Sequence, residues 1–268
     1  MTSLASSIPV AAPRRVATAV VLGALAAGAW FASLERMGGT MGGRFTVGSL
    51  GFFVVLWVLM MSAMMVPSAW PAVAVYGLVV RRRASAGANT LVRSAAFVAG
   101  YVGAWTLFGL AAFGLLAAAR AAGLDTVSST ELSRYAVAPV AFAGALYQLA
   151  PVKQVCLRNC RGPLSFFLGH WREGTPGALA MGARHGSYCV GCCWMLMLVL
   201  LALGVMSVTW MAVVSVAIAV EKLAPAAWGR LASALLTAGL VALAVVAAAR
   251  PSWLPGVGGM GHTEPSMK

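Results

Sequence analysis

Charged residues are scarce in this chain of 268 residues. Only 9% of the residues are Asp, Glu, Lys or Arg, whereas 61% are hydrophobic. The hydrophobic residues form repeated runs that a soluble domain could not expose. Because a membrane-spanning helix needs about 20 mostly apolar residues, the composition predicts a polytopic membrane protein whose first partner is the lipid bilayer.

Several motifs with a known mechanism are missing as well. The sequence has no phosphate-binding glycine loop, no metalloprotease helix motif and no serine nucleophile elbow. These absences argue against ATP-driven pumping by this chain. A net charge of +13 would suggest nucleic acid as the partner of a soluble protein. In a membrane protein the positive-inside rule accounts for basic groups such as Arg81, Arg82 and Arg83, so no nucleic-acid partner is expected.

The apolar runs predict an all-α fold, a bundle of seven membrane spans that forms one integral domain over residues 1–268. The expected spans are Val16–Leu34, Phe45–Val66, Ala95–Ala119, Tyr135–Leu149, Cys189–Val205, Ser207–Val220 and Leu231–Ala249. Six spans are the alternative, because Tyr135–Leu149 is short and Ser207–Val220 follows its predecessor almost directly. The glycine-rich tail at residues 251–268 is predicted to be flexible.

The distribution of Lys and Arg predicts the orientation of the chain. With seven spans, thirteen of these residues fall on one side of the membrane and six on the other. The positive-inside rule then places the amino terminus in the cytoplasm. The polar stretch Ala150–Arg184 contains Pro151, Pro163 and Pro176, which argue against one continuous helix. We expect a structured cytoplasmic loop there, between the fourth and fifth spans.

Soft metal ligands gather where this polar stretch meets the next apolar run. The sequence His185-Gly-Ser-Tyr-Cys189-Val-Gly-Cys192-Cys193 spaces its ligands three and four residues apart, so a helix would bring the side chains to one surface. Such a cluster suits Cu(I), with Zn(II) as the alternative. The predicted cytoplasmic side keeps thiols reduced, which favours metal ligation over disulfides.

Two further groups of soft ligands are expected at the same membrane face. Cys156 and Cys160 are four residues apart, which places both sulfur atoms on one face of a helix. The methionines of the second span form thioether pairs, Met60 with Met64 and Met61 with Met65, and thioethers favour Cu(I). The structural alternatives stay open, because buried thiols behave as small hydrophobic groups and methionines often fill cores.

Polar residues at the ends of two spans fall on the same side. Tyr147 and Gln148 end the fourth span, and Glu221 and Lys222 end the sixth. Ionisable groups at such depth are candidates for function, although Glu221 beside Lys222 fits an interfacial pair equally well. On the other side, Met37, Met41 and His262 could collect copper, but flexible glycine-rich ends need no function.

Four ordered motifs resemble a bacterial family described as predicted metal-binding integral membrane proteins. The motifs are Met60–Pro67, Tyr147–Arg161, His185–Met197, and Trp210-Met211 leading to Glu221-Lys222, within a core of residues 57–222. The family is similar to membrane copper chaperones that load tyrosinase-type copper oxidases. The resemblance implies copper handling and a multi-pass protein of the bacterial inner membrane, with a copper-dependent oxidase or a soluble copper carrier as partner.

The leading hypothesis is a membrane protein that binds Cu(I) and delivers it, which is a binding role rather than an enzymatic one. The predicted ligands are Cys156, Cys160, His185, Cys189, Cys192, Cys193, Met60, Met61, Met64 and Met65. Two alternatives are open. Cys189 and Cys192 at a helix amino terminus would suit a membrane thiol oxidoreductase, and the methionines with the cysteines would suit a metal transporter.

Overall fold

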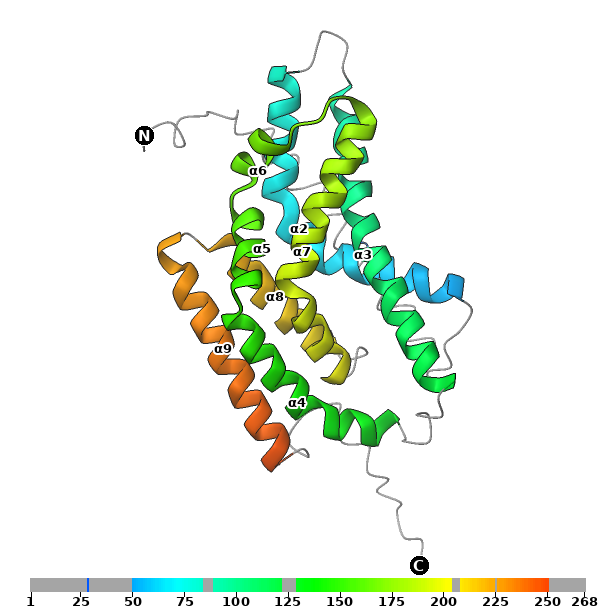
Figure 1. Ribbon diagram of the computed structural model, residues 1–268, viewed down its shortest axis with the longest axis vertical. Coiled ribbons are helices and arrows are strands. Elements are labelled where there is room, and N and C mark those ends of the chain that lie inside the picture. Colours follow the sequence, from blue (N-terminus) through cyan, green and yellow to red (C-terminus); the bar gives the residue numbers. More distant parts are fainter. Residues whose placement is uncertain are drawn as a thin grey trace, which may run out of the picture. The chain divides into compact units, whose positions relative to one another are not determined.

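The computed structural model describes residues 50–83, 89–121, 129–203, 208–224 and 226–250, together with Gly28. Within these ranges the chain forms helices and no strand, which confirms the all-α prediction. The helices are α2 (Leu50–Arg83), α3 (Thr90–Ala121), α4 (Ser129–Leu149), α5 (Pro151–Arg161), α6 (Pro163–His170), α7 (Gly174–Leu203), α8 (Val208–Leu223) and α9 (Ala226–Ala249), shown in Figure 1. Apart from Gly28, the span predicted at Val16–Leu34 lies outside the described residues, as does the tail from residue 251.

Four of the described helices are long and apolar enough to cross a membrane. They are Phe53–Arg82, Thr90–Leu115, Gly174–Leu203 and Trp228–Ala249. A fifth span arises if Ala136–Leu149 and Pro151–Arg161, which meet at an angle of 69°, form one broken span. Helix α8 has 16 residues and is not among them. The total of seven spans stays a prediction.

Helix α2 extends far beyond its predicted end. The sequence predicted a span that stops at Val66, yet α2 continues to Arg83 with Pro67 and Pro71 inside it. Membrane helices accept interior prolines because neighbouring helices and local backbone adjustments satisfy the freed carbonyl groups. The predicted end at Val66 was therefore wrong.

The polar stretch Ala150–Arg184 is helical almost throughout. It contains α5, α6 and the first part of α7, so the prediction that no single helix covers it is confirmed. Pro151 and Pro163 are the first residues of α5 and α6, where a missing backbone N–H costs nothing. Helix α7 begins at Gly174, whose positive φ of 75° favours glycine. The fifth span therefore begins well before Cys189, the start predicted from the sequence.

The described helices belong to two compact units. Unit 1 comprises residues 1–109 and 162–187, and unit 2 comprises residues 110–161 and 188–268. Helices α3 and α7 each contribute residues to both units. The predicted metal ligands are consequently divided, because Met60–Met65 and His185 belong to unit 1 and all five cysteines belong to unit 2.

Aromatic rings form the core of unit 1. Tyr76 of α2 stacks on Phe97 of α3 with ring centroids 4.9 Å apart. Phe167 of α6 meets both rings at 5.5 Å, and all three side chains are fully buried. Close van der Waals packing and ring stacking stabilise these contacts, so this cluster holds α6 against α2 and α3.

Helices α3 and α7 approach so closely in unit 1 that their backbones touch. A Cβ atom on Gly182 of α7 would overlap the carbonyl oxygen of Phe97, and one on Gly100 of α3 would overlap the carbonyl of Leu179. Small residues at helix interfaces allow such approach in membrane proteins. These glycines allow the first part of α7 to pack directly on the backbone of α3.

We expect Gly182→Ala to lower the free energy of unfolding by about 1–3 kcal/mol, because the added methyl group forces the two backbones apart. Thermal unfolding of the detergent-solubilised protein measures the change. Gly103→Ala, on the same helix as Gly100, is the matched control, because a Cβ there meets no atom within 4 Å. Equal stability of the two variants would contradict a close contact between α3 and α7.

Unit 2 is built around the packing of α4 along α9 (Figure 1). A Cβ atom on Gly144 of α4 would lie 3.4 Å from Val199 of α7 and 3.6 Å from Leu240 of α9, so α4 contacts both helices. Helix α8 packs against α5 and α9. These contacts bring α5, α7 and α8, which carry the candidate site, into one unit.

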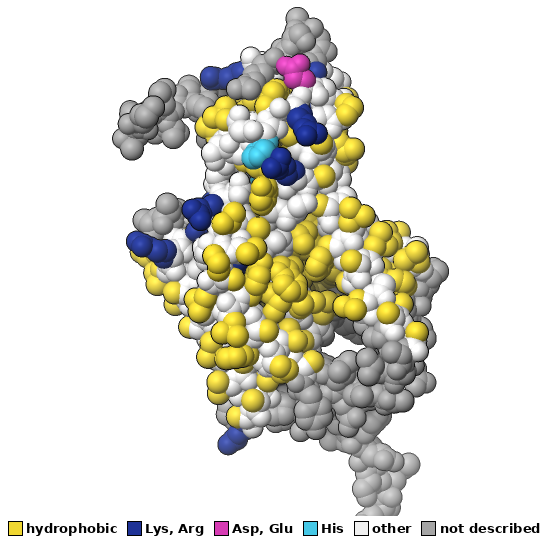
Figure 2. All heavy atoms as spheres, viewed as in Figure 1, with side chains coloured by type: hydrophobic (Ala, Val, Ile, Leu, Met, Phe, Trp, Pro, Cys, Tyr) yellow, Lys and Arg dark blue, Asp and Glu magenta, His cyan; other side chains and the backbone are white. Residues whose placement is uncertain are grey.

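The outer surfaces of α4 and α9 remain hydrophobic. Phe142 and Leu146 of α4 and Leu235 and Val245 of α9 are each more than half exposed. Figure 2 shows hydrophobic side chains over the region of these helices on the face in view. A contiguous exposed apolar surface marks a membrane or protein contact, and it agrees with the four to five candidate spans.

Candidate metal centre

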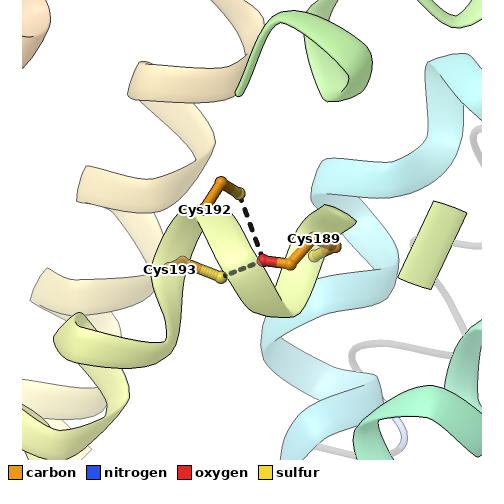
Figure 3. A group of neighbouring side chains, drawn as sticks. All are labelled: Cys189, Cys192 and Cys193. Atoms are coloured by element: carbon orange, nitrogen blue, oxygen red, sulfur yellow. Dashed lines mark hydrogen bonds between the residues drawn. The ribbon is translucent and has the colours of Figure 1, made fainter. Parts of the chain in front are cut away.

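Three thiols of α7 form the centre of the candidate site. Cys189, Cys192 and Cys193 are buried, with exposed fractions of 1%, 2% and 2%. Their sulfur atoms all lie within 4.8 Å of one another, as the helical spacing of three and four residues predicts. The thiols of Cys192 and Cys193 both donate to the carbonyl oxygen of Cys189, at 3.1 and 3.0 Å (Figure 3).

Helix α5 brings a fourth sulfur atom to this cluster. Cys160 Sγ lies 3.9 Å from Cys192 Sγ. Cys156, one turn earlier, sits against the backbone of α7, because a Cβ atom on Gly191 would lie 2.7 Å from its sulfur atom. The structure thus joins the two cysteine groups that the sequence placed at one membrane face. Whether each sulfur binds metal stays a prediction.

A lysine of α8 reaches into the same cluster. The Lys222 ammonium group donates to Cys189 Sγ at 2.9 Å, and the Lys222 side chain is only 6% exposed. Glu221, its neighbour in sequence, instead forms an ion pair with Lys153 of α5 at 2.6 and 2.7 Å. The sequence-based interpretation of Glu221 and Lys222 as an interfacial surface pair is therefore wrong, since both are buried and bond to other residues.

Further polar groups surround the Lys153–Glu221 pair. Lys153 also donates to the side-chain oxygen of Gln148, and the Ser233 hydroxyl of α9 donates to Glu221 at 3.0 Å. Arg161 donates twice to the backbone carbonyl of Glu221, at 2.8 and 2.5 Å. This network links α4, α5, α8 and α9, and it fixes the end of α8 that carries Lys222.

The end of α4 is bonded directly to the cysteine segment. The Tyr147 hydroxyl donates to the carbonyl oxygen of Gly191 at 2.5 Å, and its ring meets that of Trp194 with centroids 5.4 Å apart. Sequence reasoning singled out Tyr147 and Gln148 but missed Lys153, Arg161 and Ser233. Charge counting treated Lys153 and Arg161 as orientation signals, and only the fold shows that these side chains turn inward.

His185 lies in a different setting from the cysteines. Its ring is 2% exposed in unit 1 and is surrounded by the rings of Phe97, Tyr101, Phe166 and Phe167, with centroids 5.2 to 6.5 Å away. Among the described residues, the group of ligand atoms within 4.8 Å contains the three cysteines and not this imidazole. Its role as a ligand stays a prediction.

The methionines of α2 are buried in unit 1. Met60, Met61, Met64 and Met65 have exposed fractions of 7%, 2%, 2% and 0%. The carbonyl oxygen of Met65 accepts from the hydroxyl groups of Ser68 at 2.9 Å and Tyr101 at 3.5 Å. A lipid-facing methionine stripe is therefore excluded, whereas metal ligation stays a prediction. Met37, Met41 and His262 lie outside the described residues.

The cysteines are not at the mouth of a helix. Cys189 lies in the middle of α7, which begins at Gly174, so the expected position at a helix amino terminus is wrong. The thiol oxidoreductase alternative relied on that position, because the helix dipole lowers a thiol pKa only within the first turn. This correction removes its main physical support.

The part of the chain that contains the thiol cluster matches a known protein family. A family model described as "PpoB2: Copper chaperone" matches residues 54–247. The chain belongs to this copper chaperone family. No match was found among curated proteins or among solved structures. The matched residues contain the thiol cluster, Lys222, His185 and the methionines of α2.

Membership of the copper chaperone family agrees with the chemistry of the cluster. Thiolates are soft ligands that select Cu(I) and Zn(II) over hard cations, and Cys189, Cys192 and Cys193 could hold a metal ion. Copper handling, expected from the resemblance, is thus supported by both the family and the ligand set. The part of the chain matched by the family also includes most of the candidate spans.

Proposed function

We propose that this protein is a membrane copper chaperone that binds Cu(I) at the thiol cluster of unit 2 and delivers it to a cuproenzyme or a soluble carrier. The observation that carries the proposal is the approach of three buried cysteine sulfur atoms to within 4.8 Å of one another. A fourth sulfur, that of Cys160, lies 3.9 Å from Cys192. A buried cluster of this kind offers more than one pair of ligands to a single ion.

Exchange between ligands is the property that suits a chaperone. A structural Zn(II) site holds its ion in a closed tetrahedron of four ligands. Cu(I) can be bound by fewer sulfur ligands, so the ion can transfer from one sulfur atom to a neighbouring sulfur atom. Cys160 comes from α5 and the other three from α7, so copper can move stepwise from one helix to the other within unit 2. His185 and the methionines of α2 are proposed as further ligands within unit 1.

The exposed apolar surfaces and the candidate spans support a location in a membrane. We propose the bacterial inner membrane, with the amino terminus in the cytoplasm, because thirteen of nineteen Lys and Arg residues fall on that side in the seven-span topology. The recipient proposed from the family resemblance is a tyrosinase-type copper oxidase or a soluble copper carrier.

A transfer assay tests the delivery step. Protein purified in detergent under reducing conditions is loaded with Cu(I) and mixed with a copper-free tyrosinase-type oxidase, whose activity reports metal uptake. We expect faster activation than from a Cu(I) chelator complex that buffers the same free copper concentration. The variant Cys189→Ser/Cys192→Ser/Cys193→Ser, taken through the same loading, is expected to give no acceleration. Equal rates with the variant would overturn the proposal.

A further inference from the structure

The contact between Lys222 and the thiol cluster has a chemical consequence beyond positioning. The Lys222 ammonium nitrogen lies 2.9 Å from Cys189 Sγ, with exposed fractions of 6% and 1% for the two residues. A charge removed from water to this extent is costly unless an opposite charge lies beside it. The position of Lys222 therefore favours negative charge on the sulfur atoms of the cluster.

The carboxylate of Glu221, the residue before Lys222, bonds to other side chains. Both oxygen atoms of Glu221 contact Lys153, and one of them also accepts from Ser233. The opposite charges of Glu221 and Lys153 cancel within that pair. Lys222 instead brings its ammonium group to Cys189 Sγ, at 2.9 Å.

Arg161 holds this arrangement in place. Its guanidinium group donates to the backbone carbonyl of Glu221 at 2.8 and 2.5 Å and to that of Gly229 at 3.3 Å. These bonds join the last turn of α8 to the start of α9. The direction of the Lys222 side chain is consequently set by a bonded backbone, and Lys222 does not depend on a flexible helix end to reach Cys189.

The net charge of the thiol cluster with its bound ion indicates which metal ion the site suits best. Cysteines that bind a metal do so as thiolates, so Cu(I) held by two thiolates carries a net charge of −1. The ammonium group of Lys222 brings the total to zero, which is the favoured state in a site removed from water. The third thiol can then keep its hydrogen bond to the carbonyl of Cys189.

We infer that Lys222 is the counter-cation of a two-thiolate Cu(I) complex in the thiol cluster, with Cys189 as one of the two ligands. The inference rests on the proposed function and adds to it the residue that matches the site to a monovalent soft cation. Lys222 acts through the ligands and does not bind the metal itself.

The affinity for Cu(I) tests this role. Purified protein competes with a chromophoric Cu(I) chelator under reducing conditions, and the affinity of Lys222→Leu is compared with that of the wild type. Leucine is apolar, lacks the charge and offers no ligand to copper. We expect a loss of roughly tenfold to a hundredfold, the range for removing a hydrogen bond to a charged group. Lys222→Arg keeps the charge and is expected to stay within about threefold of the wild type.

A matched control and a second measurement separate charge from structure. Arg230→Leu removes a positive charge from an exposed position of α9 and is expected to leave the affinity unchanged. X-ray absorption of the copper-loaded wild type is expected to show two sulfur ligands. If Lys222→Leu does not remain monodisperse in detergent, Lys222→Gln takes its place in the same comparison.

Each result has a distinct meaning. An unchanged affinity in Lys222→Leu or Lys222→Gln, or a loss in Lys222→Arg as large as that in Lys222→Leu, overturns the counter-cation while the proposed function stands. Three or four sulfur ligands around copper overturn the charge count. If the wild type binds Cu(I) no better than the triple serine variant, the proposed function fails and this inference fails with it.

Discussion

Copper retained by the purified protein falls to background in the variant Cys189→Ser/Cys192→Ser/Cys193→Ser. The three sulfur atoms lie within 4.8 Å of one another, so a bound ion draws its ligands from this group. Serine oxygen is a hard donor and stays protonated at neutral pH, and it therefore does not replace a thiolate for Cu(I). We expect the copper content to drop by about tenfold or more, since loss of outer-shell partners alone costs 10- to 100-fold in metal affinity.

The same variant is expected to stay folded. A serine hydroxyl is of similar size to a thiol and can make the same hydrogen bond to the Cys189 carbonyl that Cys192 and Cys193 make. The measurement is the molar ratio of copper to protein after purification under reducing conditions, with helix content from circular dichroism as a check on folding.

Single serine variants show which sulfur atoms matter. Cys156→Ser is the matched control, because Cys156 lies outside the group of three and is only half-buried. We expect it to retain most of the copper, whereas Cys160→Ser gives an intermediate content because Cys160 touches the cluster at Cys192. A triple variant with as much copper as the wild type would rule out the cluster as the binding site.

Lys153→Met is expected to lower the free energy of unfolding by about 3–5 kcal/mol, the cost of leaving a buried charge without its partner. The side chains of Lys153 and Glu221 are 1% and 3% exposed, so water cannot replace the lost ammonium group. Ser233 and the backbone contacts of Arg161 remain, but they do not neutralise the carboxylate of Glu221. The end of α8 would loosen, together with the position of Lys222.

A double variant distinguishes the ion pair from ordinary packing. Lys153→Met/Glu221→Met removes both charges, and replacing a whole buried pair by apolar side chains is often neutral or stabilising. We therefore expect most of the lost stability to return. Unfolding in mixed micelles of mild detergent and sodium dodecyl sulfate measures both variants. A double variant as unstable as Lys153→Met would show that shape, and not charge, governs this region.

Sequence reasoning was successful where a local rule applies. The length of the apolar runs gave helices α3, α4 and α9 close to their observed positions, because a hydrophobic run of that length has one stable form in lipid. The spacing of Cys189, Cys192 and Cys193 gave their approach to one another, because the helical repeat alone sets it. Membership of a copper chaperone family followed from the ordered motifs and is confirmed by the match over residues 54–247.

The predicted helix boundaries and side-chain pairs were wrong where contacts between helices outweigh the preferences of the local sequence. Helix α7 begins at Gly174, and its first part packs closely on α3, with Gly182 against Phe97 and Gly100 against Leu179, which no single-helix pattern reveals. Helix α2 continues past Pro67 and Pro71 because the surrounding fold compensates for the prolines. The two polar residues at the end of α8 looked like a pair, yet each bonds to a residue of another helix.

Composition and residue spacing are enough to show that this protein is helical, rich in candidate membrane spans and equipped with soft metal ligands. Packing of distant helices was needed to bring Cys160 to Cys192, Lys222 to Cys189 and Glu221 to Lys153, which is 68 residues away in the sequence. The two kinds of information differ in how far apart along the chain the interacting residues lie. Helix formation and ligand spacing depend on neighbours within a turn or two, whereas the charge and composition of a buried site depend on which distant segments the packed helices bring together.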